Sequence, residues 1–356
     1  MILESPLRLY QRYPCLAGRL PRVPLTVRPT AVEPLAALDP ELWIKRDDRS
    51  GPIYGGNKPR KLEFILGDAV ARGAGTIVTF GGIGSHHALA VALCGRGSGL
   101  GVRLVAVEEP RTPHVLEMLR RNVDAGVRME VARSARGAAL AGARRLLLSG
   151  WPGKRVYLVM PGGSTPLGCV GFVEAALELE AQVRAGAMPE PAWIAVPVGS
   201  MGTAAGLLAG LALTDLRTRV LGVVVNDILR ISTGRVLRLA DRTLAFLRKH
   251  DPAVPGVRAH PERLDLPTAW LGAGYGHPTP EAERALSLIK SAAGIELETT
   301  YSGKTLAGVL ALRAAGKLPG PVLFWNTFNS VPLEPAENLP QPSALPDPLR
   351  RFFEPA

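Results

Sequence analysis

Cysteine is scarce in this chain of 356 residues, which contains only Cys15, Cys94 and Cys169. An odd number of widely separated cysteines excludes a disulfide framework, and no cysteine or histidine spacing typical of a metal site is present. Chains without disulfides are typical of reducing compartments. We therefore expect a cytoplasmic protein that holds no metal.

Aromatic residues are also few, at 5% of the chain, and no apolar run is long enough to span a membrane. The first residues contain no basic stretch followed by an apolar one, so we expect no secretory signal. Proteins that bind single-stranded nucleic acid stack bases on aromatic side chains, and this chain offers few. We expect neither a nucleic-acid partner nor a membrane partner.

Acidic residues are outnumbered: the chain has 31 Asp and Glu against 42 Lys and Arg, for a formal net charge of +11. The basic residues are dispersed in short clusters and form no long stripe of the kind that binds nucleic acid. A dispersed basic surface instead favours the attraction of small anionic molecules.

Apolar runs of strand length alternate with longer segments of helical period. The predicted strands are Leu42–Lys45, Thr76–Thr79, Val102–Val107, Arg128–Val131, Val156–Val159, Ile194–Val198, Val220–Val225 and Val322–Trp325. The predicted helices are Lys58–Arg72, His86–Gly95, His114–Ala125, Ala138–Leu148, Leu167–Ala185, Thr203–Ala212, Thr233–Lys249, Pro280–Ala293 and Lys304–Ala315. This alternation predicts an α/β fold with open, mostly parallel sheets flanked by helices.

The length of the chain allows two domains. Four predicted strands and the helices between them indicate a small domain at residues 62–171, inserted into a larger one formed by residues 1–61 and 172–356. Residues 332–356 form a proline-rich C-terminal tail. We expect its Pro332–Pro348 part to be extended on the surface or on a partner subunit.

The segment Tyr54–Glu63, with the sequence YGGNKPRKLE, places a lysine where a glycine turn leads into a helix. Lys58 and Lys61 are three residues apart, so their ammonium groups share one helical face. The nearby like charge and the positive end of the helix both favour loss of a proton. Lys58 is therefore a candidate amine nucleophile for Schiff-base chemistry. The alternative is a surface helix that happens to begin with basic residues.

A second glycine turn, within Val196–Gly206, joins a strand to a helix. Backbone N–H groups in such a turn converge on an anion, and the helix dipole stabilises it. The hydroxyl groups of Ser200 and Thr203 add donors, which suits a terminal phosphate monoester. The turn is not a P-loop, because it lacks the Gly-Lys-Ser/Thr ending. The alternatives are a turn that needs glycine only for packing, and a dinucleotide site with Asp227 near the ribose. The predicted phosphate site consists of Gly199, Ser200, Met201, Gly202 and Thr203.

A third glycine-rich corner, Thr79–His87, ends in Ser85, His86 and His87. These side chains stand at the N-terminus of a predicted helix, where a carboxylate is stabilised. The alternative is that Ser85 only caps the helix, as serine often does.

Two tyrosines and a threonine complete the candidate site. Tyr275 and Tyr301 lie beside or near glycines, which lets a ligand approach with little backbone crowding. Thr327 follows a predicted strand and can exchange one hydrogen bond with a ligand. The alternatives are half-buried packing roles for the tyrosines and local backbone bonding for the threonine.

From about Leu20 to Thr327, the order and spacing of these motifs resemble pyridoxal-phosphate enzymes of the tryptophan-synthase-β-like fold (fold type II). Within that group the chain is similar to the D-cysteine desulfhydrase and 1-aminocyclopropane-1-carboxylate deaminase family. The motifs that carry the resemblance are Lys45–Asp48, Gly55–Lys58, Gly81–Ser85, Gly162–Ser164, Gly199–Thr203, Gly274–Gly276 and Tyr301–Lys304.

The resemblance implies the cofactor pyridoxal 5'-phosphate and roles for five parts of the chain. Lys58 forms the Schiff base with the cofactor and exchanges protons with the substrate. Lys61 and the Gly199–Thr203 turn hold the phosphate. His86 stands where the family has an asparagine that hydrogen-bonds the phenolic oxygen of the cofactor, and Thr327 lies near the pyridine nitrogen.

For the substrate, the resemblance implies that Ser85, His86 and His87 face the carboxylate of a small amino acid. Tyr275 and Tyr301 line the pocket above the ring. With Lys58, the predicted catalytic residues are Ser85, Tyr275 and Tyr301. The family also suggests a homodimer.

The chain departs from the family pattern at three places. His86 stands where an asparagine is usual, and imidazole is bulkier and can carry charge near neutral pH. Ser302 stands where deaminases that open a cyclopropane ring have Glu, which argues against ring opening. Phe328, in Asn326–Asn329, replaces a glycine of the usual His-Thr-Gly-Gly, which indicates a reshaped pocket.

The leading hypothesis is a lyase that removes the α-proton of a small amino acid and eliminates a group from Cβ, as D-cysteine desulfhydrase does. One alternative keeps the cofactor and changes the outcome to racemisation, β-replacement or a specialised biosynthetic step. Another is a non-catalytic protein that binds the cofactor or amino acids. A dehydrogenase that uses the second glycine turn is a more distant alternative.

Overall fold

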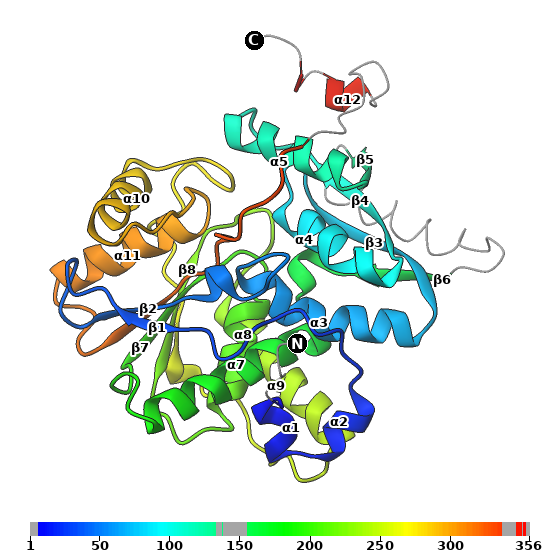
Figure 1. Ribbon diagram of the computed structural model, residues 1–356. Helices are drawn as coiled ribbons and strands as arrows, with labels where there is room; N and C mark the ends of the chain where they lie inside the picture. The colour runs from blue at the N-terminus through cyan, green and yellow to red at the C-terminus, as the bar shows by residue number, and fades with distance from the viewer. Residues whose placement is uncertain (1–5, 133–136, 138–154, 337–346, 351, 354–356) are drawn as a thin grey trace. The chain divides into compact units, whose positions relative to one another are not determined.

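Two sheets, each within its own unit of the chain, form the framework of the protein (Figure 1). The computed structural model describes residues 6–132, 137, 155–336, 347–350 and 352–353. By contacts, unit 1 comprises Met1–Phe64 and Ser164–Val331, and unit 2 comprises Ile65–Gly163 and Pro332–Ala356.

Unit 1 contains a six-stranded sheet with the order β1-β2-β10-β7-β8-β9, in which only the β1–β2 pair is antiparallel. Its strands are β1 (Val32–Pro34), β2 (Leu42–Lys45), β7 (Trp193–Val198), β8 (Arg219–Val224), β9 (Leu264–Asp265) and β10 (Val322–Trp325). Its helices are α1 (Arg8–Arg12), α2 (Cys15–Arg19), α7 (Pro166–Arg184), α8 (Gly202–Leu211), α9 (Thr233–His250), α10 (Pro280–Ala293) and α11 (Ser302–Ala314). The 3-10 turns η1 (Asp47–Arg49) and η4 (Pro261–Arg263) also belong to it.

Both faces of this sheet are buried, which explains why its central strands are continuously apolar. Successive side chains of a strand point to opposite faces. In β7, Ile194 packs into the core formed with α7, α8 and α9, whereas Ala195 packs into the core formed with α10 and α11. In β10, Trp325 and Phe324 divide between the same two cores.

Unit 2 contains a four-stranded parallel sheet with the order β5-β4-β3-β6. Its strands are β3 (Ala74–Gly82), β4 (Gly101–Val107), β5 (Arg128–Ala132) and β6 (Arg155–Val159). Helix α4 (His86–Gly95) packs on β3 and β4 and against α5 (Pro113–Asp124). Helix α3 (Asn57–Ala71) begins in unit 1 and runs into unit 2, and η2 (Arg96–Ser98), η3 (Pro161–Gly163) and α12 (Asp347–Arg350) complete the described elements.

The predicted α/β class is confirmed, and every predicted strand is present. The predicted helices also match within a few residues, except Ala138–Leu148, which lies outside the described residues. The sequence analysis missed α1, α2, α12, β1 and β9, and α12 begins inside the segment that was expected to be extended. Each spans five residues or fewer, too few for a hydrophobic period to emerge, and β1 ends in Pro34 at the edge of the sheet.

The domain boundaries expected from the sequence, at 61/62 and 171/172, stay a prediction. The contact units change over at Phe64/Ile65 and Gly163/Ser164, and they group the residues after Val331 with unit 2. The described start of the tail, residues 332–336, has neither helix nor strand. Arg121 of α5 donates to the carbonyl of Glu334 at 3.0 Å.

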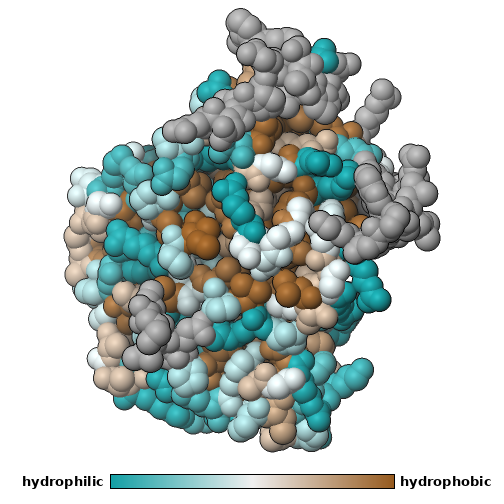
Figure 2. Space-filling view, turned by 45° about the vertical axis from the view of Figure 1, so that its right-hand side comes forward, coloured by the Kyte–Doolittle hydropathy of each residue, from teal (hydrophilic) through white to brown (hydrophobic). Residues whose placement is uncertain are grey.

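Exposed large hydrophobic side chains are spread along the chain from Val27 to Leu288. On the face shown in Figure 2, hydrophilic residues surround separate groups of hydrophobic ones. Single exposed apolar residues are normal for a folded chain and mark no docking surface by themselves. Over the part of the chain that the structure describes, no helix has the length and apolarity needed to cross a membrane.

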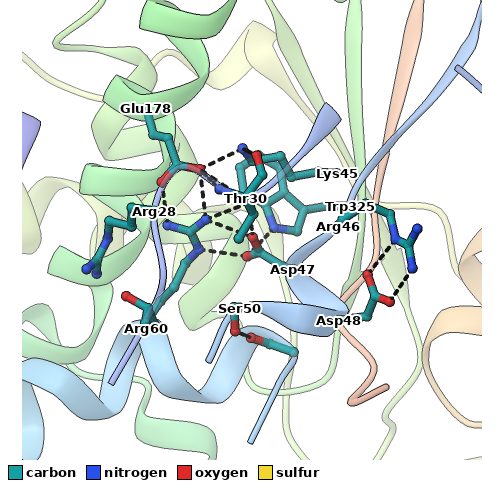
Figure 3. A network of polar contacts seen from close by, with 12 residues as sticks. Arg28, Thr30, Lys45, Arg46, Asp47, Asp48, Ser50, Arg60, Glu178 and Trp325 are labelled. Carbon is teal, nitrogen blue, oxygen red and sulfur yellow. Dashed lines mark hydrogen bonds and ion pairs between the residues drawn. The ribbon is translucent and has the colours of Figure 1, made fainter. Parts of the chain in front are cut away.

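A buried network of charges surrounds Arg60, in the first turn of α3 (Figure 3). The Arg60 guanidinium donates to both oxygens of Asp47 at 2.8 Å and to Glu178 at 3.0 and 3.1 Å. Lys45 Nζ donates to Glu178 at 2.6 Å, and the Trp325 indole donates to Asp47 at 2.7 Å. Two cations thus face two carboxylates, and β2, η1, α3, α7 and β10 are tied together at one place.

Burial of this network favours neutral carboxylates, yet the cations reverse that effect. Burial by itself raises the pKa of Glu178, but Arg60 and Lys45 outweigh it and leave that pKa well below its usual range. Removing one partner of such a pair leaves an uncompensated buried charge. The resulting loss of stability is larger than the net stability that the intact pair provides.

Arg60→Ala should therefore lower the free energy of unfolding by about 3–5 kcal/mol, because Asp47 and Glu178 lose their main partner. Arg72→Ala removes an arginine that directly follows the same helix, is 68% exposed and is paired with Asp68, and should change that free energy by less than about 1 kcal/mol. Urea unfolding of both variants, followed by circular dichroism, measures the difference. Equal effects of the two substitutions would contradict this role of the network.

Candidate functional site

Lys58 is the second residue of α3 and follows a turn that only glycine can form here. Gly56 has φ +78°, and a Cβ at that position would lie 2.4 Å from the Thr327 carbonyl oxygen. The backbone N–H of Asn57 donates to the same carbonyl at 3.3 Å. The start of α3 is thus held against the chain that follows β10.

The Lys58 amine has an environment that disfavours charge. Burial and the nearby Lys61 ammonium lower its pKa to about 7, against the opposing effect of Glu298. Burial likewise lowers the pKa of Lys61 to about 8, against the effect of Cys169. Lys58 is only half-buried, so a ligand can reach it. A large share of such an amine is neutral at pH 7 and can act as a nucleophile or a base.

The predicted phosphate turn has the geometry of an anion site. Helix α8 starts at Gly202, directly after Met201, which has φ 72° and is the only described non-glycine residue with positive φ. A Cβ on Gly202 would lie 2.9 Å from Lys61 Nζ and 2.5 Å from Ser164 Oγ. A lysine ammonium and the N-terminus of a helix therefore converge on this turn, and both attract an anion.

Two residues that the sequence analysis did not assign complete the turn. Ser164 Oγ accepts from the Gly202 N–H at 3.0 Å and donates to Ser200 Oγ at 2.9 Å. Asn57 Nδ2 donates to Thr203 Oγ1 at 3.1 Å. The Gly162–Ser164 motif pointed to the first of these residues, and the position directly before Lys58 pointed to the second.

The predicted pocket tyrosines meet in unit 1. The hydroxyl groups of Tyr275 and Tyr301 are 2.5 Å apart, and their rings pack edge to face. The loop of Tyr275 is fixed by Asp227, which accepts from the Tyr275 N–H at 3.0 Å, and by buried Lys304, which donates to the Gly274 carbonyl at 3.1 Å. Asp227 therefore has a structural partner in place of the ribose considered in the dehydrogenase alternative.

Ser302 is completely buried at the start of α11, beside a carboxylate that the sequence analysis missed. Glu298 accepts from the N–H groups of Thr300, Tyr301 and Ser302 at 2.6–3.0 Å, and from Ser302 Oγ at 2.8 Å. A carboxylate just before a helix satisfies its free N–H groups and interacts with its dipole. The place of Glu298 in the sequence, just before a predicted helix, was the signal that could have identified it.

The segment Asn326–Asn329, which departs from the family pattern, makes contacts that hold the local structure. Asn329 Oδ1 accepts from the Gly55 N–H, and Asn326 Oδ1 accepts from the Phe328 N–H at 3.2 Å. The amide of Asn329 thus ties this segment to the glycine turn before Lys58. Phe328 is half-buried. The proposed role of the Thr327 hydroxyl near a pyridine nitrogen stays a prediction.

The third corner lies in unit 2. Ser85 is the N-cap of α4 and accepts from the Ala88 N–H at 3.2 Å, as the capping alternative predicted. His86 Nε2 lies 2.9 Å from Nε2 of His114, and the two rings stack. His87 is buried. The sequence analysis missed His114 because it is 28 residues away, in α5. The substrate-binding roles of Ser85, His86 and His87 stay predictions.

Among the described residues, no group of three or more histidine, cysteine or acidic side chains is placed to hold a metal ion.

Comparisons with known proteins show the family to which the chain belongs. The chain belongs to the family described as "Pyridoxal-phosphate dependent enzyme", whose model matches residues 23–327. Within it, the chain groups with the D-cysteine desulfhydrases and 1-aminocyclopropane-1-carboxylate (ACC) deaminases, as the sequence motifs predicted. The predicted cofactor, pyridoxal phosphate, is confirmed by this membership.

Three relatives illustrate the range of the family. Nocardicin C-9' epimerase of Nocardia uniformis subsp. tsuyamanensis is 36% identical over 87% of this chain and 93% of its own. D-cysteine desulfhydrase of Klebsiella pneumoniae (strain 342) is 32% identical over 87% of this chain and 94% of its own. A crystal structure described as an ACC deaminase homologue superposes with a TM-score of 0.78 at 28% identity, covering 91% of this chain and 95% of its own.

The anion turn can be tested by adding one methyl group. Gly202→Ala should weaken pyridoxal-phosphate binding by about tenfold or more, because its Cβ displaces the Lys61 ammonium and the Ser164 hydroxyl. Gly18→Ala, in α2, has nothing within 4 Å of the added Cβ and should leave binding unchanged. Titration of the cofactor into each apoenzyme, followed by absorbance, gives the affinities. Unchanged affinity in the Gly202 variant would show that the phosphate binds elsewhere.

Proposed function

We propose that this enzyme removes the α-proton of a small amino acid and eliminates a leaving group from its Cβ, as a D-cysteine desulfhydrase-like lyase. The observation that carries the proposal is the Lys58 amine, whose pKa is lowered to about 7 beside Lys61 and the anion turn. Such an amine can attack a carbonyl carbon and can take a proton from carbon near neutral pH.

The residues of unit 1 fit pyridoxal phosphate. Lys61, the hydroxyl groups of Ser200 and Thr203 and the N-terminus of α8 offer donors for its phosphate, and Lys58 offers the amine for its aldehyde. When bound, the cofactor supplies an aldehyde that captures amino groups and a ring that accepts electrons from Cα.

The acid and base groups of unit 1 suit elimination of a thiolate. Lys58 holds the abstracted proton, and a thiolate leaves with little acid assistance because the pKa of a thiol is about 8.5. Ser302 occupies the place where ring-opening deaminases have Glu, and the adjacent Glu298 carboxylate is engaged by N–H groups at the start of α11. These features support elimination rather than cyclopropane opening.

Epimerisation at Cα is a second candidate. It uses the same abstraction of the α-proton but returns a proton to Cα instead of expelling a group from Cβ. The 36% identity to nocardicin C-9' epimerase, over most of both chains, favours it.

We also propose that the enzyme works in the cytoplasm as a homodimer. The absence of a disulfide pattern in the sequence supports the first point, and the resemblance to the family supports the second. Light scattering on the purified enzyme tests the dimer, and a monomer mass would contradict it.

Lys58→Ala should abolish the visible absorbance of lysine-bound pyridoxal phosphate and lower kcat by at least about 10³-fold, because both the nucleophile and the base are lost. Lys249→Ala, which changes an exposed lysine near the end of α9, should retain both properties. Spectra and single-turnover kinetics measure the two effects. A Lys58→Ala enzyme with normal turnover would rule out the proposal.

The outcome of the reaction can be read from its products. We expect sulfide, pyruvate and ammonium from D-cysteine in D₂O. Deuterium at Cα with inverted configuration and no sulfide would instead assign the enzyme to epimerisation. Spectral changes without product, across a panel of D- and L-amino acids, would indicate a binding protein and contradict both activities.

A further inference from the structure

Asn57 lies between the reactive amine and the anion turn and bonds to both. Its Oδ1 accepts from Lys58 Nζ at 2.7 Å, and its Nδ2 donates to Thr203 Oγ1 at 3.1 Å. The side chain is buried, with 9% of its surface exposed. The charged form of Lys58 has donors but no acceptor, so with that form the amide turns its oxygen to Lys58 and its NH₂ to Thr203.

We propose that Asn57 is a positioning residue that holds the Lys58 amine and relays to it, through Thr203, whether an anion occupies the Gly199–Thr203 turn. The inference builds on the proposed role of Lys58 as the reactive amine.

The charges around Lys58 explain why an anion in the turn should change the protonation of its amine. Lys61 disfavours the charged form of Lys58, and Glu298 favours it. The Lys61 ammonium lies at the turn, above Gly202. An anion bound there compensates the charge of Lys61, which removes part of the repulsion that keeps Lys58 neutral.

The hydrogen-bonded chain acts in the same direction. Thr203 Oγ1 accepts from Asn57, so its own proton is available to an anion in the turn. A hydroxyl that donates becomes a better acceptor, and polarisation along the chain makes Asn57 Oδ1 a better acceptor for the Lys58 ammonium. A bound phosphoryl group therefore makes Lys58 a stronger base, better able to keep a proton taken from carbon.

The relay can be tested without turnover on the full chain freed of cofactor. The rate at which Lys58 is acetylated by acetic anhydride, measured against pH by mass spectrometry of its peptide, reports the neutral amine. Without phosphate we expect a midpoint at about pH 7. Saturating inorganic phosphate should raise it by about one unit, because an opposite charge favours the ammonium. Exposed Lys249, read in the same digest, should not respond to phosphate.

Two variants separate the relay from the charge of Lys61. Thr203→Val keeps the Asn57–Lys58 bond but breaks the chain, so the phosphate-induced shift should fall to less than half. Asn57→Asp places a carboxylate next to Nζ and should raise the midpoint by about 1–3 units without phosphate. If Asn57 had only a structural role, the phosphate-induced shift in Thr203→Val would equal that of the wild type.

The inference is overturned if phosphate leaves the wild-type midpoint in place, or if the Thr203→Val shift equals that of the wild type. The wild-type and Thr203→Val measurements decide even if Asn57→Asp does not fold, which circular dichroism reveals. A phosphate shift in an enzyme without turnover would keep the relay and reject the proposed lyase. Normal turnover without a shift would reject only the relay.

Discussion

The guanidinium of Arg60, buried between Asp47 and Glu178, is the constraint on which the site depends. Arg60 lies between Lys58 and Lys61 in the first turns of α3, so its bonds fix both the position and the rotation of that helix. Desolvating four charged groups is costly, and the network is tolerable only because its cations and carboxylates balance and every guanidinium nitrogen has a partner. Lys58 and Lys61, three residues apart, are then held on another face of the helix.

This division of charges accounts for the lowered pKa of Lys58. In the network, each cation meets a carboxylate, and the pKa of Arg60 stays well above its usual value. Lys58 meets an amide, Asn57, and a like charge, Lys61, so burial is only partly compensated and its pKa falls to about 7. One helix thus carries an arginine that stays charged and a lysine whose pKa is lowered to about 7, and the difference arises from which neighbours each side chain has.

Local patterns in the sequence were sufficient to predict the elements that carry the site. The apolar runs of β7 and β10 and the glycine turns before α3 and α8 are visible over a few residues each. Contacts between distant segments could not be predicted from such local patterns. Glu178 reaches Arg60 from 118 residues away, and Ser164 reaches Gly202 from 38 residues away. The short helices α1 and α2 could not be predicted because no hydrophobic period develops in five residues.

A crystal structure of the cofactor-loaded enzyme tests the central claim most directly. The account predicts continuous electron density from the Nζ atom of Lys58 to the cofactor, with the phosphate bonded to Lys61 and to the backbone N–H groups at the start of α8. A lysine 58 side chain without attached density, or a phosphate bound away from Gly199–Thr203, would contradict it.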